Sequence, residues 1–182
     1  MRELALHILD IVQNSVVAGA GIITITIEDD SSKDRLAFSI TDDGKGMDEE
    51  TIAKVTDPFY TTRTTRKVGL GLPMLKETAL SCGGSFAIDS RPGEGTVVSA
   101  SYQRSHIDRP PLGDMASTML AILLGNEEIN IRYSHRRDQQ VFVFESGEMK
   151  EVLDGLSFQN PEVYQWLKEF LTEGEKSVDG EI

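Results

Sequence analysis

The sequence predicts an α+β fold whose strands come mainly in antiparallel pairs, because helical and alternating apolar patterns follow one another along the chain. Residues 1–104 read as helix, strand, strand, helix, loop, helix, strand, strand. Residues 114–173 add another helix, two strands and a final helix. We therefore expect a mixed, mostly antiparallel sheet with helices packed on it, followed by a small αββα C-terminal extension.

Length and composition are those of an ordinary soluble protein. The 182 residues are 39% hydrophobic and 26% charged, and the formal net charge is −12. Such a charge disfavours nucleic acid and anionic membranes as partners. A single cysteine excludes an intrachain disulfide, and no segment has the roughly 20 apolar residues of a membrane span. We expect a cytoplasmic protein with neither nucleic acid nor membrane as a partner.

The first predicted element is a helix over residues 2–18 that is apolar on most sides. Its polar residues Glu3, His7, Asp10 and Asn14 form one narrow stripe. A helix that is buried except along such a stripe usually directs the stripe at something specific. For His7 we expect a hydrogen-bonded neighbour of Asp10.

Two alternating runs follow the first helix and predict an antiparallel hairpin. Ile23, Ile25 and Ile27 share one face of the first strand, and the polar segment 29–34 forms the turn. Asp42 has the same parity as the apolar residues of the second strand, so we expect its carboxylate on the buried side. A carboxylate in that position needs a partner.

The remaining elements are predicted from periodicity and from turn and helix-end signals. Residues 105–113 are expected to be a linker, residues 174–182 a disordered tail, and His135 part of a solvated hairpin turn. The expected helices span 49–55, 70–81, 114–124 and 161–171, and the expected strands span 85–89, 96–102, 129–133 and 141–144.

The first motif with chemical potential is Asp10-Ile-Val-Gln-Asn14. The spacing of four places both polar groups on one helix face. An amide oxygen is a suitable Mg²⁺ ligand, and a carboxylate one turn away can orient a water molecule or accept a proton. Taken alone, the pair is equally typical of a solvated helix face.

The second motif is Asp42-Asp-Gly44-Lys-Gly46-Met47. An inward carboxylate at Asp42 can accept a hydrogen bond from the exocyclic amine of adenine, while Gly44 and Gly46 let the backbone turn tightly against a ligand. The simpler alternative is a glycine-rich turn after a strand.

Two further motifs suggest contacts with phosphate. The segment Asp57-Pro-Phe59-Tyr-Thr-Thr62-Arg63 runs into a basic loop, whose arginines suit bidentate contacts to a triphosphate. The segment Gly69-Leu70-Gly71-Leu72-Pro73 opens a helix, whose backbone amides form a ready anion site. A mobile basic surface loop is the alternative for the first segment. Thr96, after the turn Gly93-Glu-Gly95, is expected to point its hydroxyl toward Asp42.

Together these motifs resemble the N, G1, F, G2 and G3 boxes of the GHKL ATPases, over residues 1–104 and in the same order. The F and G2 boxes most resemble those of histidine kinases. The resemblance implies a two-layer α/β sandwich (the Bergerat fold), ATP and Mg²⁺ as cofactors, Asn14 as the metal ligand, and Asp10 in the catalytic position. It implies nucleotide contacts from Asn14, Asp42, Gly44, Gly46, Met47, Phe59, Thr62, Arg63, Gly69, Leu70, Gly71, Leu72 and Thr96.

The opening residues also resemble small stand-alone ATP-binding proteins of anaerobic bacteria that are associated with iron hydrogenase. Relative to histidine kinases, we expect neither the phosphoacceptor hairpin nor the strand before the first helix. We therefore expect one C-terminal strand, 129–133 or 141–144, to cover the open sheet edge.

Many hydrolytic members of the family have glutamate where this chain has Asp10, so we expect slow hydrolysis or phosphotransfer. The leading hypothesis is an ATP-binding regulatory protein, a histidine-kinase-like ATPase or protein kinase acting on a separate partner protein or phosphoacceptor, and able to assemble as a homodimer. The alternatives are an ATP-driven clamp of the topoisomerase or mismatch-repair type, and a non-catalytic nucleotide sensor.

Overall fold

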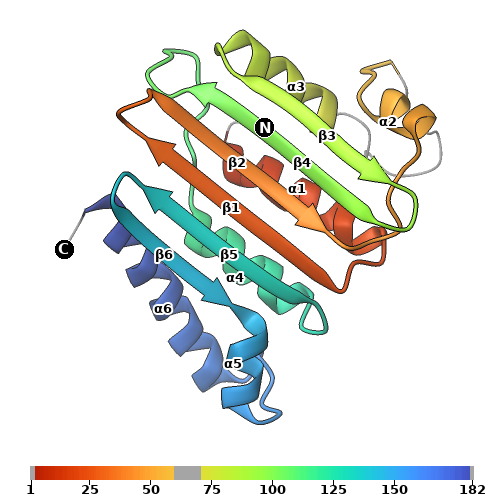
Figure 1. Cartoon of the computed structure of the whole chain (residues 1–182). Coiled ribbons are helices and arrows are strands. Elements are labelled where there is room, and N and C mark those ends of the chain that lie inside the picture. The colour runs from red at the N-terminus through yellow and green to blue at the C-terminus, as the bar shows by residue number, and fades with distance from the viewer. Residues whose placement is uncertain (1–2, 60–70, 181–182) are drawn as a thin grey trace.

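The computed structural model describes residues 3–59 and 71–180, and these residues form one sheet with helices against it (Figure 1). Its elements are α1 (Leu4–Val17), β1 (Ile22–Asp30), β2 (Arg35–Asp42), α2 (Glu49–Val55), α3 (Gly71–Ser81), β3 (Ser85–Arg91), β4 (Gly95–Gln103), α4 (Met115–Gly125), β5 (Asn130–Arg137), β6 (Gln140–Glu145), α5 (Ser146–Leu153) and α6 (Pro161–Asp179).

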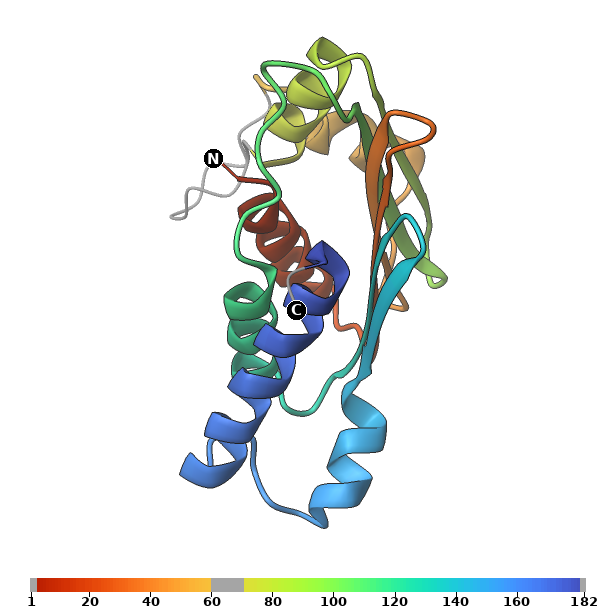
Figure 2. The ribbon, with the colours of Figure 1, turned by 90° about the vertical axis from the view of Figure 1, so that its left-hand side faces the viewer.

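The architecture is a two-layer α/β sandwich, as predicted. The strand order is β3-β4-β2-β1-β5-β6, and β1–β5 is the parallel pair in an otherwise antiparallel sheet. Helices α1, α3, α4 and α6 lie on one side of the sheet (Figure 2). Ile23, Ile25 and Ile27 of β1 are fully buried against this helical layer, as the alternation of the strand predicts.

The C-terminal strands extend the first sheet, which confirms the prediction that one of them covers its open edge. β5 pairs with β1 in parallel, with Ile23 opposite Ile131 and Ile25 opposite Tyr133, and β6 pairs with β5. One core cluster contains buried residues from both parts of the chain. The edge of β1 is therefore satisfied by backbone hydrogen bonds rather than left exposed.

The segment 105–113 contains no helix or strand and passes over the start of α1. The amides of Leu4 and Ala5 donate to the carbonyl oxygens of Pro111 and Leu112, at 2.9 and 2.8 Å. The first amides of a helix have no partner within the helix, and Glu3 provides no side-chain cap here. The linker therefore supplies the acceptors that hold the beginning of α1.

The C-terminal part differs from the prediction in three places. α6 continues to Asp179, so residues 174–179 are helical and not the expected disordered tail, because Val178 is buried and Glu175 bonds to the sheet. An additional helix, α5, follows β6. His135 lies on β5 and is 2% exposed, with Nδ1 2.8 Å from the Glu175 carboxylate, so it is not in a solvated turn.

None of the described helices combines the length and the apolar character needed to span a bilayer.

Candidate functional site

A cavity of about 440 Å³ opens between α1, α2, the beginning of α3, the end of β2 and the beginning of β4. Its walls contain eight of the residues singled out in the sequence. They are Asp10, Asn14, Asp42, Gly46, Met47, Gly71, Leu72 and Thr96. Side chains up to 86 positions apart in the chain thus meet around one space of ligand size.

Two predicted site residues of the described chain lie outside these walls. Gly44 packs under the end of α1, where an added Cβ would lie 2.9 Å from both the Cβ and the carbonyl oxygen of Ala18. Phe59 is 92% exposed. The predicted contacts at Thr62, Arg63, Gly69 and Leu70 fall outside the described residues.

Asp42 is the buried carboxylate of the cavity, and its burial is compensated by two hydrogen bonds. Ser15 Oγ donates to Oδ2 at 2.6 Å, and the amide of Gly44 donates to Oδ1 at 2.9 Å. The side chain remains on the cavity wall although the residue is only 8% exposed. It can therefore still accept a hydrogen bond from a ligand.

The sequence reasoning missed Ser15 as the partner of Asp42. Ser15 follows Asn14 directly on α1 and is 3% exposed, so a hydroxyl on an otherwise apolar helix face was the available signal. Thr96 lies opposite Asp42 in the β2–β4 register, as its parity suggests. Its Oγ1, however, lies 2.8 Å from Ser90 Oγ, which corrects the expectation that the hydroxyl points toward Asp42.

The loop after β2 is held from two sides by its backbone. The amide of Lys45 donates to the carbonyl oxygen of Ala18 at 2.9 Å, and the Lys45 carbonyl accepts from the amide of Gly93 at 2.7 Å. The amide of Met47 donates to Ser90 Oγ at 2.8 Å. These bonds fix the loop between the end of α1 and the β3–β4 turn, which positions Gly46 and Met47 at the cavity.

Asp43 has a structural role that differs from that of its neighbour Asp42. Its Oδ1 accepts the amides of Gly21 and Ile22, at 2.8 and 2.9 Å. The hydrogen bond from Ile22 is the main cause that lowers the pKa of Asp43. Asp43 therefore closes the turn before β1, whereas Asp42 faces the cavity.

Asp10 and Asn14 stand one helical turn apart on the cavity wall. Burial raises the pKa of Asp10 above its ordinary value, which makes this carboxylate a better proton acceptor. Within the described residues, no group of three or more His, Cys, Asp or Glu side chains could hold a metal ion. The pair fits Mg²⁺ because this ion commonly takes few protein ligands and completes its coordination with phosphate oxygens and water.

Other parts of the cavity wall can attract negative charge. Gly71 and Leu72, the first residues of α3, line the cavity, and the amides of a first helical turn have no partners within the helix. Lys45 contributes a cation to the described wall. The cavity thus has a carboxylate acceptor at one place and donors suited to phosphate at another.

This geometry agrees with the comparison with known families. Residues 2–106 match the model described as "Histidine kinase-, DNA gyrase B-, and HSP90-like ATPase", which covers more than half of the chain. The chain belongs to this ATPase family. The resemblance inferred from the five sequence boxes is therefore confirmed at the level of the family.

Several relatives of this ATPase domain are bacterial kinases. The chain is 37% identical to Sensor protein kinase FleS of Pseudomonas aeruginosa over 49% of its own length and 22% of the relative's. It is 32% identical to a non-motile and phage-resistance protein of Caulobacter vibrioides, over 56% of this chain and 13% of that protein. The matched region thus spans less than a quarter of either relative.

A solved structure gives the same fold. The chain is similar to the Aquifex aeolicus MutL ATPase domain complexed with ADP, with a TM-score of 0.52, 14% identity, and coverage of 85% of this chain and 70% of that one. At this identity the likeness establishes the fold alone.

His7, on the same polar stripe of the ATPase domain, departs from the prediction. It is 1% exposed, and neither ring nitrogen has a hydrogen-bond partner in the described chain, so the expected bond to Asp10 is absent there. Burial is the main cause that lowers the pKa of His7. The folded protein therefore favours the neutral ring.

We expect His7→Leu to make the protein more stable and less sensitive to acid. Removing a buried polar group without a partner should raise the free energy of unfolding by about 1 kcal/mol at pH 7.5. Because the folded-state pKa of His7 is lowered, the unfolded chain binds the proton more readily, and stability falls as the pH drops below about 6.5. Urea unfolding of both proteins at pH 7.5 and pH 5.5 measures this difference.

The matched control is His106→Leu in the linker, which should leave the loss on acidification unchanged. If acidification lowered the free energy of unfolding of His7→Leu as much as that of the wild type, the His7 imidazole would not be the cause of the acid sensitivity.

Proposed function

We propose that this chain binds ATP with Mg²⁺ and acts as a slow ATPase or protein kinase, regulating or phosphorylating a separate partner protein. The observation that supports the proposal most is the single cavity shared by Asp10, Asn14, Asp42 and the beginning of α3. These groups can bind adenine, a metal ion and a phosphate chain and can supply a general base within one site.

In this proposal the adenine lies against Asp42. The carboxylate accepts the exocyclic amine, and guanine is disfavoured because it presents a carbonyl oxygen at that position. Ser15 and the Gly44 amide hold the carboxylate in place from behind. Met47 and Val98, on the same wall, provide apolar contact for the base.

The phosphates then extend toward α3. Backbone amides at Gly71 and Leu72 and the side chain of Lys45 would bind their oxygens. Thr62, Arg63, Gly69 and Leu70 are proposed to complete this contact. Asn14 would hold Mg²⁺, which when bound neutralises charge on the phosphate oxygens.

Asp10 is proposed as the general base. In hydrolysis a water oxygen attacks the γ-phosphorus, the bond from that phosphorus to the bridging oxygen breaks, ADP leaves, and the water proton passes to Asp10. In phosphotransfer a side chain of the partner protein replaces the water. Aspartate is one methylene shorter than glutamate, so the attacking group must lie closer or be reached through a second water, which supports slow turnover.

We expect Asp10→Asn to spare ATP binding and to remove most turnover. The amide keeps the shape of the side chain but cannot accept the proton, so phosphate release should fall by about 100-fold, while the Kd for ATP stays within about threefold. Calorimetry measures binding, and a coupled phosphate assay measures release.

Gln13→Ala, on the exposed side of the same helix, is the matched control and should change neither quantity. An unchanged rate in Asp10→Asn would refute Asp10 as the base. Binding without turnover by the wild type would favour the nucleotide sensor, and transfer of labelled phosphate to a candidate protein would favour the kinase. ATP-dependent dimerisation together with turnover would favour the clamp.

A further inference from the structure

A second cavity of about 210 Å³ lies at the opposite end of the sheet from the proposed nucleotide site. Asp29 at the end of β1 and Leu36 at the beginning of β2 form one side. Pro111 and Leu112 of the linker form another, and His135 and Arg137 of β5 a third. The cavity therefore lies where the first sheet strands, the linker and the C-terminal part meet.

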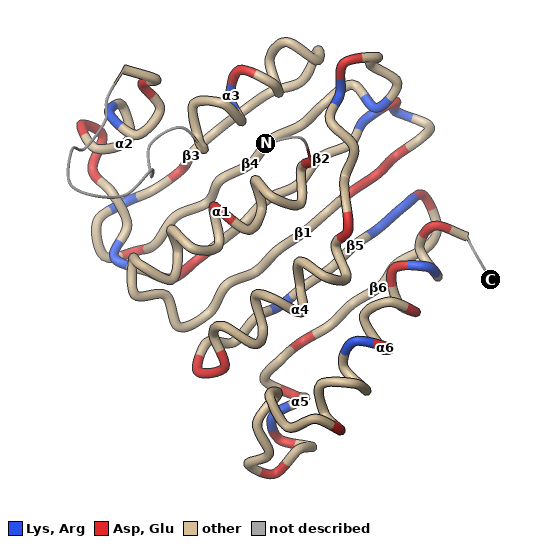
Figure 3. The backbone as a smooth tube through the Cα atoms, turned by 180° about the vertical axis from the view of Figure 1, so that it is seen from behind, with Lys and Arg blue, Asp and Glu red and all other residues tan. Residues whose placement is uncertain are grey.

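The charge of this cavity is opposite to that of the chain as a whole. Three guanidinium groups, those of Arg104, Arg109 and Arg137, share its walls with two carboxylates, those of Asp29 and Asp179. The excess is one positive charge in a chain whose net charge is −12. Figure 3 shows Lys and Arg segments interleaved with Asp and Glu segments at this end of the sheet, around the β1–β2 turn.

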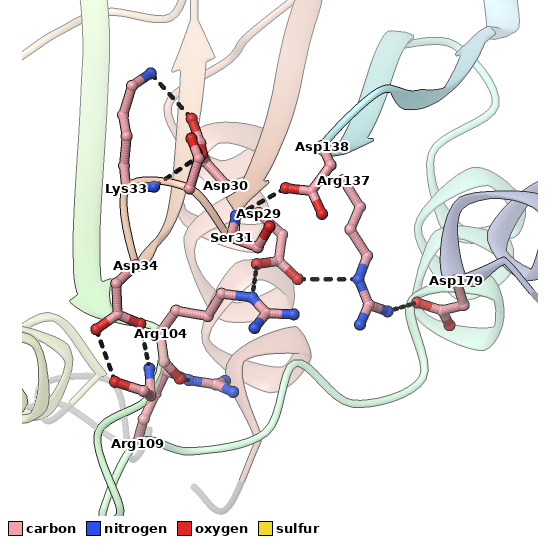
Figure 4. Close-up of polar contacts among 12 residues, drawn as sticks. Asp29, Asp30, Ser31, Lys33, Asp34, Arg104, Arg109, Arg137, Asp138 and Asp179 are labelled. Atoms are coloured by element: carbon pink, nitrogen blue, oxygen red, sulfur yellow. Dashed lines mark hydrogen bonds and ion pairs between the residues drawn. The ribbon is translucent and has the colours of Figure 1, made fainter.

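Ion pairs hold two of the three arginines in position (Figure 4). Arg104 Nε lies 2.5 Å from one Asp29 oxygen, and Arg137 Nε lies 3.5 Å from the other. Arg137 Nη1 also lies 2.8 Å from Asp179 on α6. The Asp29 carboxylate thus lies between two guanidinium groups, and its own charge is more than matched.

Arg109 has no carboxylate partner among the described residues. Its Nε and Nη1 donate to the carbonyl oxygens of Arg104 and Pro110, both at 2.8 Å. Backbone carbonyls fix the direction of the guanidinium group but leave its full charge unpaired. A fixed, partly buried guanidinium group on a cavity wall is suited to bind an anion, because little side-chain entropy remains to be lost.

His135 provides an independent indication at the same cavity. It is 2% exposed, and its Nδ1 faces the Glu175 carboxylate, which also accepts the Tyr133 hydroxyl at 2.7 Å. Nε2 has no hydrogen-bond partner in the described chain, and the residue lines the cavity. Because Nδ1 donates to Glu175, Nε2 of the neutral ring is an acceptor, so it can bond to a protonated ligand oxygen such as that of hydrogen phosphate.

We propose that this cavity binds a compact dianion, a phosphate-like or short dicarboxylate group, held by Arg109 and Arg137, with His135 accepting from a protonated oxygen where the ligand has one. The volume is several times that of one water molecule and below that of a drug-sized ligand, which suits such a group. Through Pro111 and Leu112, whose carbonyls hold the beginning of α1, the bound anion stabilises the packing of the linker on the first helix. The site is independent of the proposed ATP site.

The test is thermal unfolding and calorimetry of the full chain without nucleotide, in phosphate, in malonate, and in chloride at matched ionic strength. We expect at least one dianion to raise the Tm above that in chloride. Phosphate alone would identify a phosphoryl ligand, malonate alone a dicarboxylate, and both together recognition by charge and size.

Arg109→Gln and Arg137→Gln should each weaken dianion binding by about 10-fold or more. Arg136→Gln, which faces the opposite side of β5, is the matched control and should bind like the wild type. If Arg109→Gln fails to fold, Arg137→Gln, outside the linker, decides the matter. No dianion-specific rise in Tm, or an equal rise in the wild type and both cavity variants, would overturn the proposal.

Discussion

Replacing Asp42 with asparagine is expected to weaken ATP binding by at least about 30-fold. A hydrogen bond from the adenine amine to a charged acceptor contributes about 1.5–3 kcal/mol, and an amide nitrogen turned toward the ligand would repel the amine. Ser15 can still bond to the amide, so the fold should be kept. Calorimetric titration with ATP and with GTP measures the loss and any change in base preference.

Asp89→Asn is the control for this variant. Asp89 is an exposed residue of β3 that lies opposite Val97, one position from Thr96. The substitution therefore removes a nearby negative charge without changing the cavity. ATP affinity should be unchanged in Asp89→Asn. If Asp42→Asn bound ATP as tightly as the control, the proposed place of the adenine would be wrong.

Gly95→Ala is expected to lower the free energy of unfolding by about 3 kcal/mol or more. Gly95 has a φ of +98°, and a Cβ there would lie 2.0 Å from the carbonyl oxygen of Asp42. A left-handed conformation costs an alanine about 1–2 kcal/mol, and displacement of packed backbone adds a comparable amount. Because the displaced carbonyl belongs to Asp42, ATP affinity should fall as well. Urea unfolding and calorimetry measure the two effects.

Gly93→Ala separates conformational strain from the clash. Gly93 has a φ of +80° in the same turn, but an added Cβ would meet no atom within 4 Å. The free energy of unfolding of this variant should fall only by the cost of the left-handed conformation, about 1–2 kcal/mol. Its affinity for ATP should be unchanged. If the free energy of unfolding fell equally in Gly95→Ala and Gly93→Ala, the clash with the Asp42 carbonyl would not contribute to the destabilisation.

Local sequence patterns predicted most helices and strands within a few residues. The β1 alternation of Ile23, Ile25 and Ile27 placed those side chains on the buried face, and the parity of Asp42 placed its carboxylate there too. These features follow from the period of the strand, which the chain carries locally.

Elements that depend on tertiary contacts were missed. α5 is short and has one buried residue, Ser146, whose Oγ accepts the amide of Ile131 at 2.8 Å. The last turns of α6 have an acidic composition typical of a tail, yet Glu175 accepts hydrogen bonds from two β5 side chains. Their partners are far away in the sequence, so no local pattern could indicate α5 or the last turns of α6.

By itself, the sequence determined the ATPase family, the sandwich fold and eight residues of the cavity wall, because these depend on motif spacing and strand parity. Tertiary structure alone decided that Ser15 is the partner of Asp42, that Thr96 bonds to Ser90, and that His7 is left without a partner in the described chain. The physical reason is that hydrogen bonds are directional and select one partner among several within reach, a choice that depends on how the elements pack.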